Sequence, residues 1–129
     1  MYEIPSFLQY GEVYTAGAGE VIYQSGNELE GTPIYYTVAG LVRLELGPAG
    51  GCPITVYASP DSLFGIVEVM CGTRRLMTAT SLEATILYRW DHESYQTAHS
   101  VSWELALQAF NSLTRMLRIL NAEYTEHTR

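Results

Sequence analysis

The 129-residue sequence contains no lysine, so its seven positive charges are all arginines, set against fourteen Asp and Glu residues and a formal net charge of −7. A chain this acidic repels polyanions, which excludes nucleic-acid binding through a broad basic surface. No apolar run approaches the roughly 18 residues that suggest a membrane span, and no charged segment leads into an apolar one at the start. We therefore expect a soluble, cytoplasmic protein that does not bind membranes.

Cysteine and histidine are also scarce. Two cysteines, Cys52 and Cys71, are too few for a four-thiolate iron–sulfur or zinc site, and neither belongs to a CxxC pair. The histidines, His92, His99 and His127, show no HxH or HExxH spacing, and none stands where it argues for haem ligation. We expect reduced cysteines, no metal site and no cofactor.

The region from Val13 to Trp90 consists of short apolar or alternating runs rich in Val, Ile, Tyr and Thr. Gly, Pro, Asn and Asp separate these runs, a pattern typical of a compact all-β sandwich or barrel. Length and an apolar share of 47% fit a single core. The predicted strands are 12-EVYTA, 20-EVIYQ, 34-IYYTVAG, 41-LVRLEL, 54-ITVYA, 62-SLFGI, 75-RLMTATS and 84-ATILYRW.

Beyond the last predicted strand the pattern becomes helical. Asp91 is a suitable N-cap for the short segment HESYQ, and Ser100 or Ser102 can cap a much longer helix. We expect residues 1–98 to form a β domain with short flanking helices and residues 99–129 to form the long helix.

Apolar residues recur along the long helix at spacings of four and three, which makes a continuous seam. The seam consists of Ala106, Phe110, Leu113, Leu117, Leu120 and Tyr124, and a second row consists of Trp103, Leu105, Ala109, Met116 and Ile119. A helix with two apolar faces must be covered on two sides, and little chain remains to cover the second one. We therefore predict a homodimer in which the seam pairs with that of a second copy.

Three short motifs follow one another in order: G-E-x-I-Y-x-x-G in 19-GEVIYQSG, Y-Y-x-x-x-G-x-V-R from Tyr35 to Arg43, and F-G at Phe64 and Gly65. In this order and spacing the chain resembles the effector-sensing half of the CRP/FNR regulators, built on the cyclic-nucleotide-binding fold. The resemblance covers nearly the whole chain. It implies an eight-stranded β-roll of jelly-roll type followed by a dimerising helix.

The resemblance also implies a ligand cassette after the F-G motif. In nucleotide-binding members a glycine starts a short helical turn, the next residue is a glutamate that binds the ribose, and a later arginine followed by Ser or Thr pairs with the phosphate. In this sequence Gly65 is followed by Ile66, and the nearest acid is Glu68. A buried ribose hydroxyl without its partner forfeits on the order of 1–3 kcal/mol, which argues against cAMP or cGMP as the ligand.

The adjacent arginines Arg74 and Arg75 fit the cassette in neither register. Counting back from Ala79 puts Thr73 at the arginine position, and a one-residue slip puts Arg74 there with Arg75 at the Ser/Thr position. Two interpretations remain open. Either the pair binds an anion such as a carboxylate or phosphate, or one arginine is exposed and the other pairs with an acid such as Glu68.

We expect a ligand between the roll and the long helix. The candidate ligand-binding residues are Phe64, Gly65, Ile66, Glu68, Thr73, Arg74, Arg75, Arg115 and Arg118.

The leading hypothesis is a non-catalytic sensor domain of a transcription regulator, in which a small effector other than a cyclic nucleotide, with anions among the candidates, resets the pairing of two long helices. No helix-turn-helix follows, and the sequence stops in mid-helix without a C-cap glycine, so we expect DNA contact only through a further C-terminal domain. A stand-alone cyclic-nucleotide-binding-like module and a purely structural dimerisation module with an empty roll are alternatives. A cupin-like metal enzyme would need histidines on its strands, and the predicted strands contain none.

Overall fold

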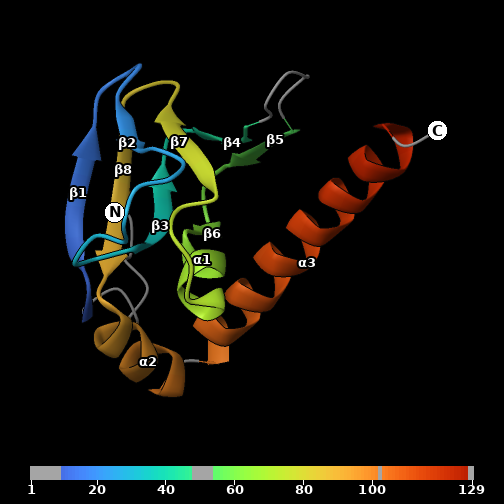
Figure 1. Cartoon of the computed structure of the whole chain (residues 1–129). Coiled ribbons are helices and arrows are strands. Elements are labelled where there is room, and N and C mark those ends of the chain that lie inside the picture. The colour runs from blue at the N-terminus through green and yellow to red at the C-terminus, as the bar shows by residue number, and fades with distance from the viewer. Residues whose placement is uncertain (1–9, 48–53, 102, 128–129) are drawn as a thin grey trace.

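The computed structural model describes residues 10–47, 54–101 and 103–127, which form two antiparallel four-stranded sheets and three helices. The first sheet contains, in spatial order, β1 (Glu12–Ala16), β8 (Thr85–Trp90), β3 (Ile34–Ala39) and β6 (Leu63–Phe64). The second contains β2 (Val21–Tyr23), β7 (Met77–Ser81), β4 (Val42–Leu46) and β5 (Ile54–Ala58). The helices are α1 (Ile66–Cys71), α2 (His92–Val101) and α3 (Trp103–His127). The expected β-roll followed by a long helix is confirmed (Figure 1).

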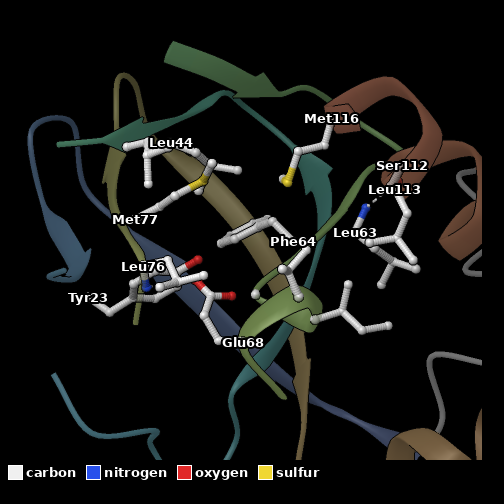
Figure 2. Close-up of a pocket in the computed structure, with 14 residues that line it drawn as sticks. Tyr23, Leu44, Leu63, Phe64, Glu68, Leu76, Met77, Ser112, Leu113 and Met116 are labelled. Atoms are coloured by element: carbon white, nitrogen blue, oxygen red, sulfur yellow. Dashed lines mark hydrogen bonds between the residues drawn. The ribbon is translucent and has the colours of Figure 1, made fainter. Parts of the chain in front are cut away.

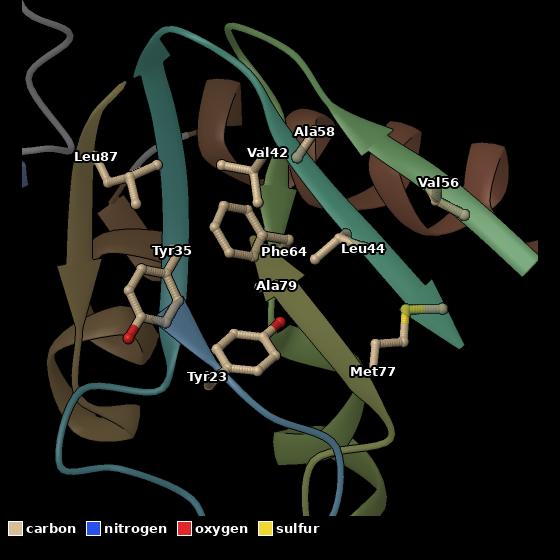
Figure 3. Close-up of a cluster of buried hydrophobic side chains, with 10 residues drawn as sticks. All are labelled: Tyr23, Tyr35, Val42, Leu44, Val56, Ala58, Phe64, Met77, Ala79 and Leu87. Atoms are coloured by element: carbon tan, nitrogen blue, oxygen red, sulfur yellow. The ribbon is translucent and has the colours of Figure 1, made fainter. Parts of the chain in front are cut away.

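Two apolar cores arise from the period-two alternation of β3. Tyr35 points between the sheets, where it stacks on Phe64 with 5.1 Å between ring centroids (Figure 3). Its neighbours Ile34 and Tyr36 point to the opposite face and join the core beneath the helices. Because successive side chains of a strand alternate between faces, a central strand covered on both sides is apolar throughout. Helices α1 and α2 and the first turns of α3 therefore pack on the outside of the first sheet.

Asp91 caps α2, as its position in the sequence predicts. Its Oδ1 accepts a hydrogen bond from the Ser94 N–H at 2.6 Å, and this backbone bond, with further hydrogen bonding to Ser94, lowers the pKa of Asp91. The helix is longer than the predicted HESYQ segment, so the expected domain boundary between residues 98 and 99 falls inside it. The alternative cap Ser102 lies outside the described residues.

Helix α3 runs along β6 and β5 (Figure 1). One of its apolar rows faces its own chain. Leu105 and Ala109 are buried, and Met116 and Ile119 pack against the core between the sheets. The second predicted row is thus covered within the chain wherever its side chains are described; the side chain of Trp103 lies outside the described residues.

The predicted dimer seam is only partly exposed. Phe110 and Leu117 are each 67% exposed, whereas Leu113 packs against the core beneath the helices and Ala106 is half-buried. Leu113 is thus partly covered by its own chain, because its position on the helix turns it towards the roll. The side chains of the two remaining seam residues, Leu120 and Tyr124, are not among those described.

Candidate functional site

The site begins where β6 stops. Gly65 has a φ of 83°, which lets the chain leave Phe64 and start α1 at the next residue, and Gly72, with a φ of 67°, ends that helix. The helical turn implied by the resemblance is present. Helix α1 directs Glu68 inward, and this residue is only 3% exposed.

Arg75 is fully buried and is held entirely by its own chain. Its Nε and Nη2 donate to the two carboxylate oxygens of Glu30, at 3.2 and 2.6 Å. Nη2 also donates to the Pro33 carbonyl at 2.6 Å, while Nη1 donates to the Gly65 carbonyl at 3.1 Å and to Glu68 Oε2 at 3.4 Å. A guanidinium has five N–H donors, so this set of acceptors uses them all.

The surroundings keep Arg75 charged despite its burial. Burial lowers the pKa of the guanidinium, but the hydrogen bond to Glu30 and the negative charges of Glu30 and Glu68 raise it by more, so the net shift of the pKa is upward. Its Cζ lies 3.7 Å from the centre of the Tyr23 ring, a cation–π contact. Burial, followed by the Glu68 charge, raises the pKa of Tyr23. The cluster is therefore an internal ion network.

Arg74 differs from its neighbour in every respect. Its side chain is 65% exposed and pairs at 3.2 Å with Glu28, which is more exposed still. Thr73 is exposed and donates its N–H to the Glu68 carbonyl, where it helps to close α1. The structure agrees with the second interpretation of the arginine pair: Arg74 lies at the surface, and Arg75 pairs with Glu68.

A cavity of about 100 Å³ lies between the second sheet, α1 and α3 (Figure 2). Four of the nine candidate ligand-binding residues line it: Phe64, Gly65, Ile66 and Glu68. The others do not: Thr73, Arg74, Arg75, Arg115 and Arg118.

The two arginines of α3 lie elsewhere. Arg115 donates from Nη2 to the Ser62 hydroxyl at 3.0 Å and to the Tyr57 carbonyl at 3.4 Å, so it fastens α3 to the loop that precedes β6. Arg118 is exposed. Both residues are therefore away from the cavity, since they lie on the flank of α3 that does not face its interior.

Sequence reasoning missed much of the cavity wall. Leu44 and Met77 reach it from the second sheet, and Ser112 and Met116 reach it from α3. The Ser112 hydroxyl accepts the backbone N–H of Leu63 at 3.1 Å, which ties α3 to β6. A signal was available for the α3 residues, because Ser112 and Met116 are four apart and continue the apolar row that packs on the roll.

The site differs at two positions from the nucleotide cassette that the resemblance implies. A Cβ added at Gly65 would lie 2.4 Å from the Pro33 carbonyl oxygen and 2.9 Å from Arg75 Nη1, so the glycine makes room for the chain's own arginine. Ile66 occupies the position of the ribose-binding glutamate, and the buried arginine has no donor left for a phosphate.

Among the residues that the structure describes, no three His, Cys, Asp or Glu side chains gather as a metal site would require. None of the helices so described is both long enough and apolar enough to cross a membrane.

Comparisons with known proteins agree on the fold. A family model described as "Cyclic nucleotide-binding domain" matches residues 15–113, whereas a search of curated proteins finds no match. The structure of the Thermus thermophilus Catabolite Activator Protein is similar at 25% identity and a TM-score of 0.75, over 95% of this chain and 57% of that one. The chain thus spans little more than half of that relative.

Two other solved structures share the fold at lower identity. The haem domain of CooA from Rhodospirillum rubrum has 14% identity and a TM-score of 0.78, over 95% of this chain and 86% of that one. Oxidized CprK in complex with o-chlorophenolacetic acid has 19% identity and a TM-score of 0.72, over 93% of this chain and 48% of that one. Since the family model covers well over half of the sequence, the chain belongs to the cyclic nucleotide-binding domain family, with CRP/FNR-type regulators as its structural neighbours.

Proposed function

We propose that the chain is the effector-sensing part of a dimeric, non-catalytic transcription regulator, in which a small molecule in the cavity alters the pairing of two α3 helices and so an attached DNA-binding domain. The observation that carries this proposal is that α3 itself forms one wall of the cavity, through Ser112, Leu113 and Met116. A ligand there touches the helix whose outer face is exposed.

The coupling has a short physical route. Ile66 and Leu113 line the cavity and also an open groove of about 710 Å³ between α1, α2 and α3, which Phe110 lines as well. A ligand that moves Leu113 must therefore move a residue one turn from the exposed seam. Such a ligand shifts the dimer only by its difference in affinity for the two arrangements.

The outer face of α3 supports pairing with a second copy. Leu107, Phe110 and Leu117 are exposed and follow the three- and seven-residue spacings of a helix–helix seam. Large apolar side chains left in water at these spacings favour a matching apolar surface, which a two-fold axis supplies from the same residues. CprK, a similar structure, is described in complex with o-chlorophenolacetic acid, so the fold accommodates ligands other than nucleotides.

The pairing is tested with Leu117→Asp, measured by sedimentation equilibrium. We expect the wild type to be a dimer and the variant a monomer, because a carboxylate in an apolar seam is buried without a partner. Ala122→Asp is the matched control, since it adds the same charge at an exposed position of α3 away from Phe110 and Leu117. A wild-type monomer, or equal weakening by both variants, would contradict the pairing.

The sensing role is tested by thermal denaturation against a panel of small uncharged compounds, organic acids, phosphates and cAMP. A ligand that binds only the folded chain raises Tm with its concentration. We expect at least one class of compound to raise Tm and also to change the dimerisation constant. Stabilisation by no compound would favour a structural module with an empty roll.

A further inference from the structure

The charge at the cavity wall is negative, although the sequence suggested a positive one. Glu68 lines the cavity, whereas Arg75 lies behind it and does not. The Glu68 carboxylate is already engaged: Oε2 accepts from Arg75 and Oε1 accepts from the Leu76 N–H at 3.3 Å. A ligand entering the cavity therefore meets a buried carboxylate.

An anion gains nothing by displacing that carboxylate. Arg75 would still be held on its other side by Glu30 and by two backbone carbonyls. The displaced Glu68, only 3% exposed, would then be a buried charge without its ion-pair partner. Removing one partner of a buried pair is strongly unfavourable, so the network resists exchange with an external anion.

The rest of the wall is apolar. Leu44 and Met77 on one side face Phe64, Leu63 and Met116 on the other (Figure 2). The polar side chains among the lining residues are Tyr23, Glu68 and Ser112, and each of the last two already accepts a backbone N–H. Such a wall favours burial of apolar surface and offers few fixed polar contacts.

Volume limits the ligand further. The cavity of about 100 Å³ is smaller than the roughly 300–1,000 Å³ of pockets for drug-sized ligands. An engineered apolar cavity of about 150 Å³ holds benzene, so this smaller space admits at most about one aromatic ring or a comparable aliphatic molecule.

From these observations, and resting on the proposed function above, we infer that the effector of this cavity is a small, uncharged and mainly apolar molecule of about one aromatic ring. The arginine pair in the sequence suggested an anionic ligand. In the structure the positive charge of Arg75 is neutralised inside the protein by Glu30 and Glu68, so it does not attract an anion to the cavity.

The test compares benzyl alcohol with benzoate, which share a ring and differ in charge, with cAMP as a third probe. Binding is followed by NMR chemical-shift titration of the full chain. We expect benzyl alcohol to bind at least about 100-fold more tightly than benzoate, since the benzoate carboxylate would be buried beside the Glu68 carboxylate and none of the described residues that line the cavity is cationic. The variant Glu68→Gln should narrow that ratio at least tenfold.

A second variant locates the site without disturbing the ion network. Met116→Trp adds volume at the cavity wall and should abolish benzyl alcohol binding, whereas Arg118→Ala, exposed on the same helix, should leave it unchanged. Binding of benzyl alcohol that survives Met116→Trp overturns the assignment to this cavity. Benzoate or cAMP binding more tightly, and being lost in Met116→Trp, overturns the ligand class while leaving the sensor function intact. Binding of no probe, together with no stabilisation by any compound of the wider panel, overturns both.

Discussion

Replacement of Arg75 by methionine should remove a large part of the stability of the fold, while the same change at Arg74 should have little effect. Arg75→Met keeps most of the side-chain length but leaves the buried Glu68 carboxylate without its ion partner and two backbone carbonyls without their donor. Breaking a buried ion pair from one side costs about 3–5 kcal/mol. Arg74→Met breaks only a pair whose two side chains are 65% and 79% exposed, so the expected cost is at most about 1 kcal/mol.

Urea denaturation followed by circular dichroism measures both losses, with all variants at one protomer concentration because dimerisation adds to apparent stability. A typical domain has about 5–15 kcal/mol in total, so the Arg75 loss should be plain in the midpoint. Arg75→Lys should restore little of the lost stability, since an ammonium group cannot donate to all the acceptors that surround the planar guanidinium. In a double-mutant cycle with Glu68→Gln we expect a coupling of about 1–3 kcal/mol. If Arg75→Met costs less than about 1 kcal/mol, the network does not stabilise the fold and the charge argument for the cavity fails with it.

Three further predictions concern the elements around the site. Gly72→Ala should cost about 1–2 kcal/mol for its left-handed backbone, and Gly65→Ala should cost clearly more, because its Cβ would lie 2.4 Å from a carbonyl oxygen whereas Gly72 faces open space. Ser112→Ala should lower the free energy of unfolding by about 1–2 kcal/mol, because the backbone N–H of Leu63 in β6 would lose its acceptor. Ser100→Ala, at an exposed position, should be nearly neutral. Burial raises the pKa of Tyr95 to about 12. Since a tyrosine in the unfolded chain ionises near pH 10, the free energy of unfolding should fall as pH rises from about 10 to 12. Tyr95→Phe should reduce the slope of that fall by up to about 1.4 kcal/mol per pH unit.

Urea midpoints report the first two comparisons, and the third needs them across pH 9 to 12. Equal losses at the two glycines would show that the close approach at Gly65 has room to relax. A loss at Ser100 as large as that at Ser112 would remove the case for the β6 contact. An unchanged alkaline slope in Tyr95→Phe would mean that other tyrosines carry the pH dependence.

The strands were largely predictable because each carries its own local pattern. β1 and β5 have the predicted bounds, since alternating apolar residues and flanking turn residues define both ends. β2 and β7 are each two residues shorter than predicted, and the largest difference is at β6, predicted over residues 62–66 and observed only at Leu63–Phe64. The positive φ at Gly65 ends it, and the apolar residues that follow belong to α1.

The sequence predicted which residues of α3 share a row, but not whether each row is buried or exposed. Spacing alone places Leu113 with Phe110 and Leu117, yet Leu113 is turned to the roll while the other two lie in solvent. The rotation of a helix about its axis depends on which residues of distant strands it meets. For α3 those contacts include Leu63 with Ser112, which are 49 residues apart in the chain.

The sequence by itself determined the β-roll, the long amphipathic helix, the cap at Asp91 and the loss of the ribose-binding glutamate at Ile66. All of these depend on local spacing, turn chemistry or the identity of one residue. The tertiary structure alone decided which of two adjacent arginines is buried and what its charge does. Arg75 finds Glu30, 45 residues away, whereas Arg74 points to solvent. Both arginines lie in the loop between α1 and β7, where no regular alternation fixes which side chain turns inward, so only the packed fold buries one positive charge and leaves a carboxylate facing the cavity.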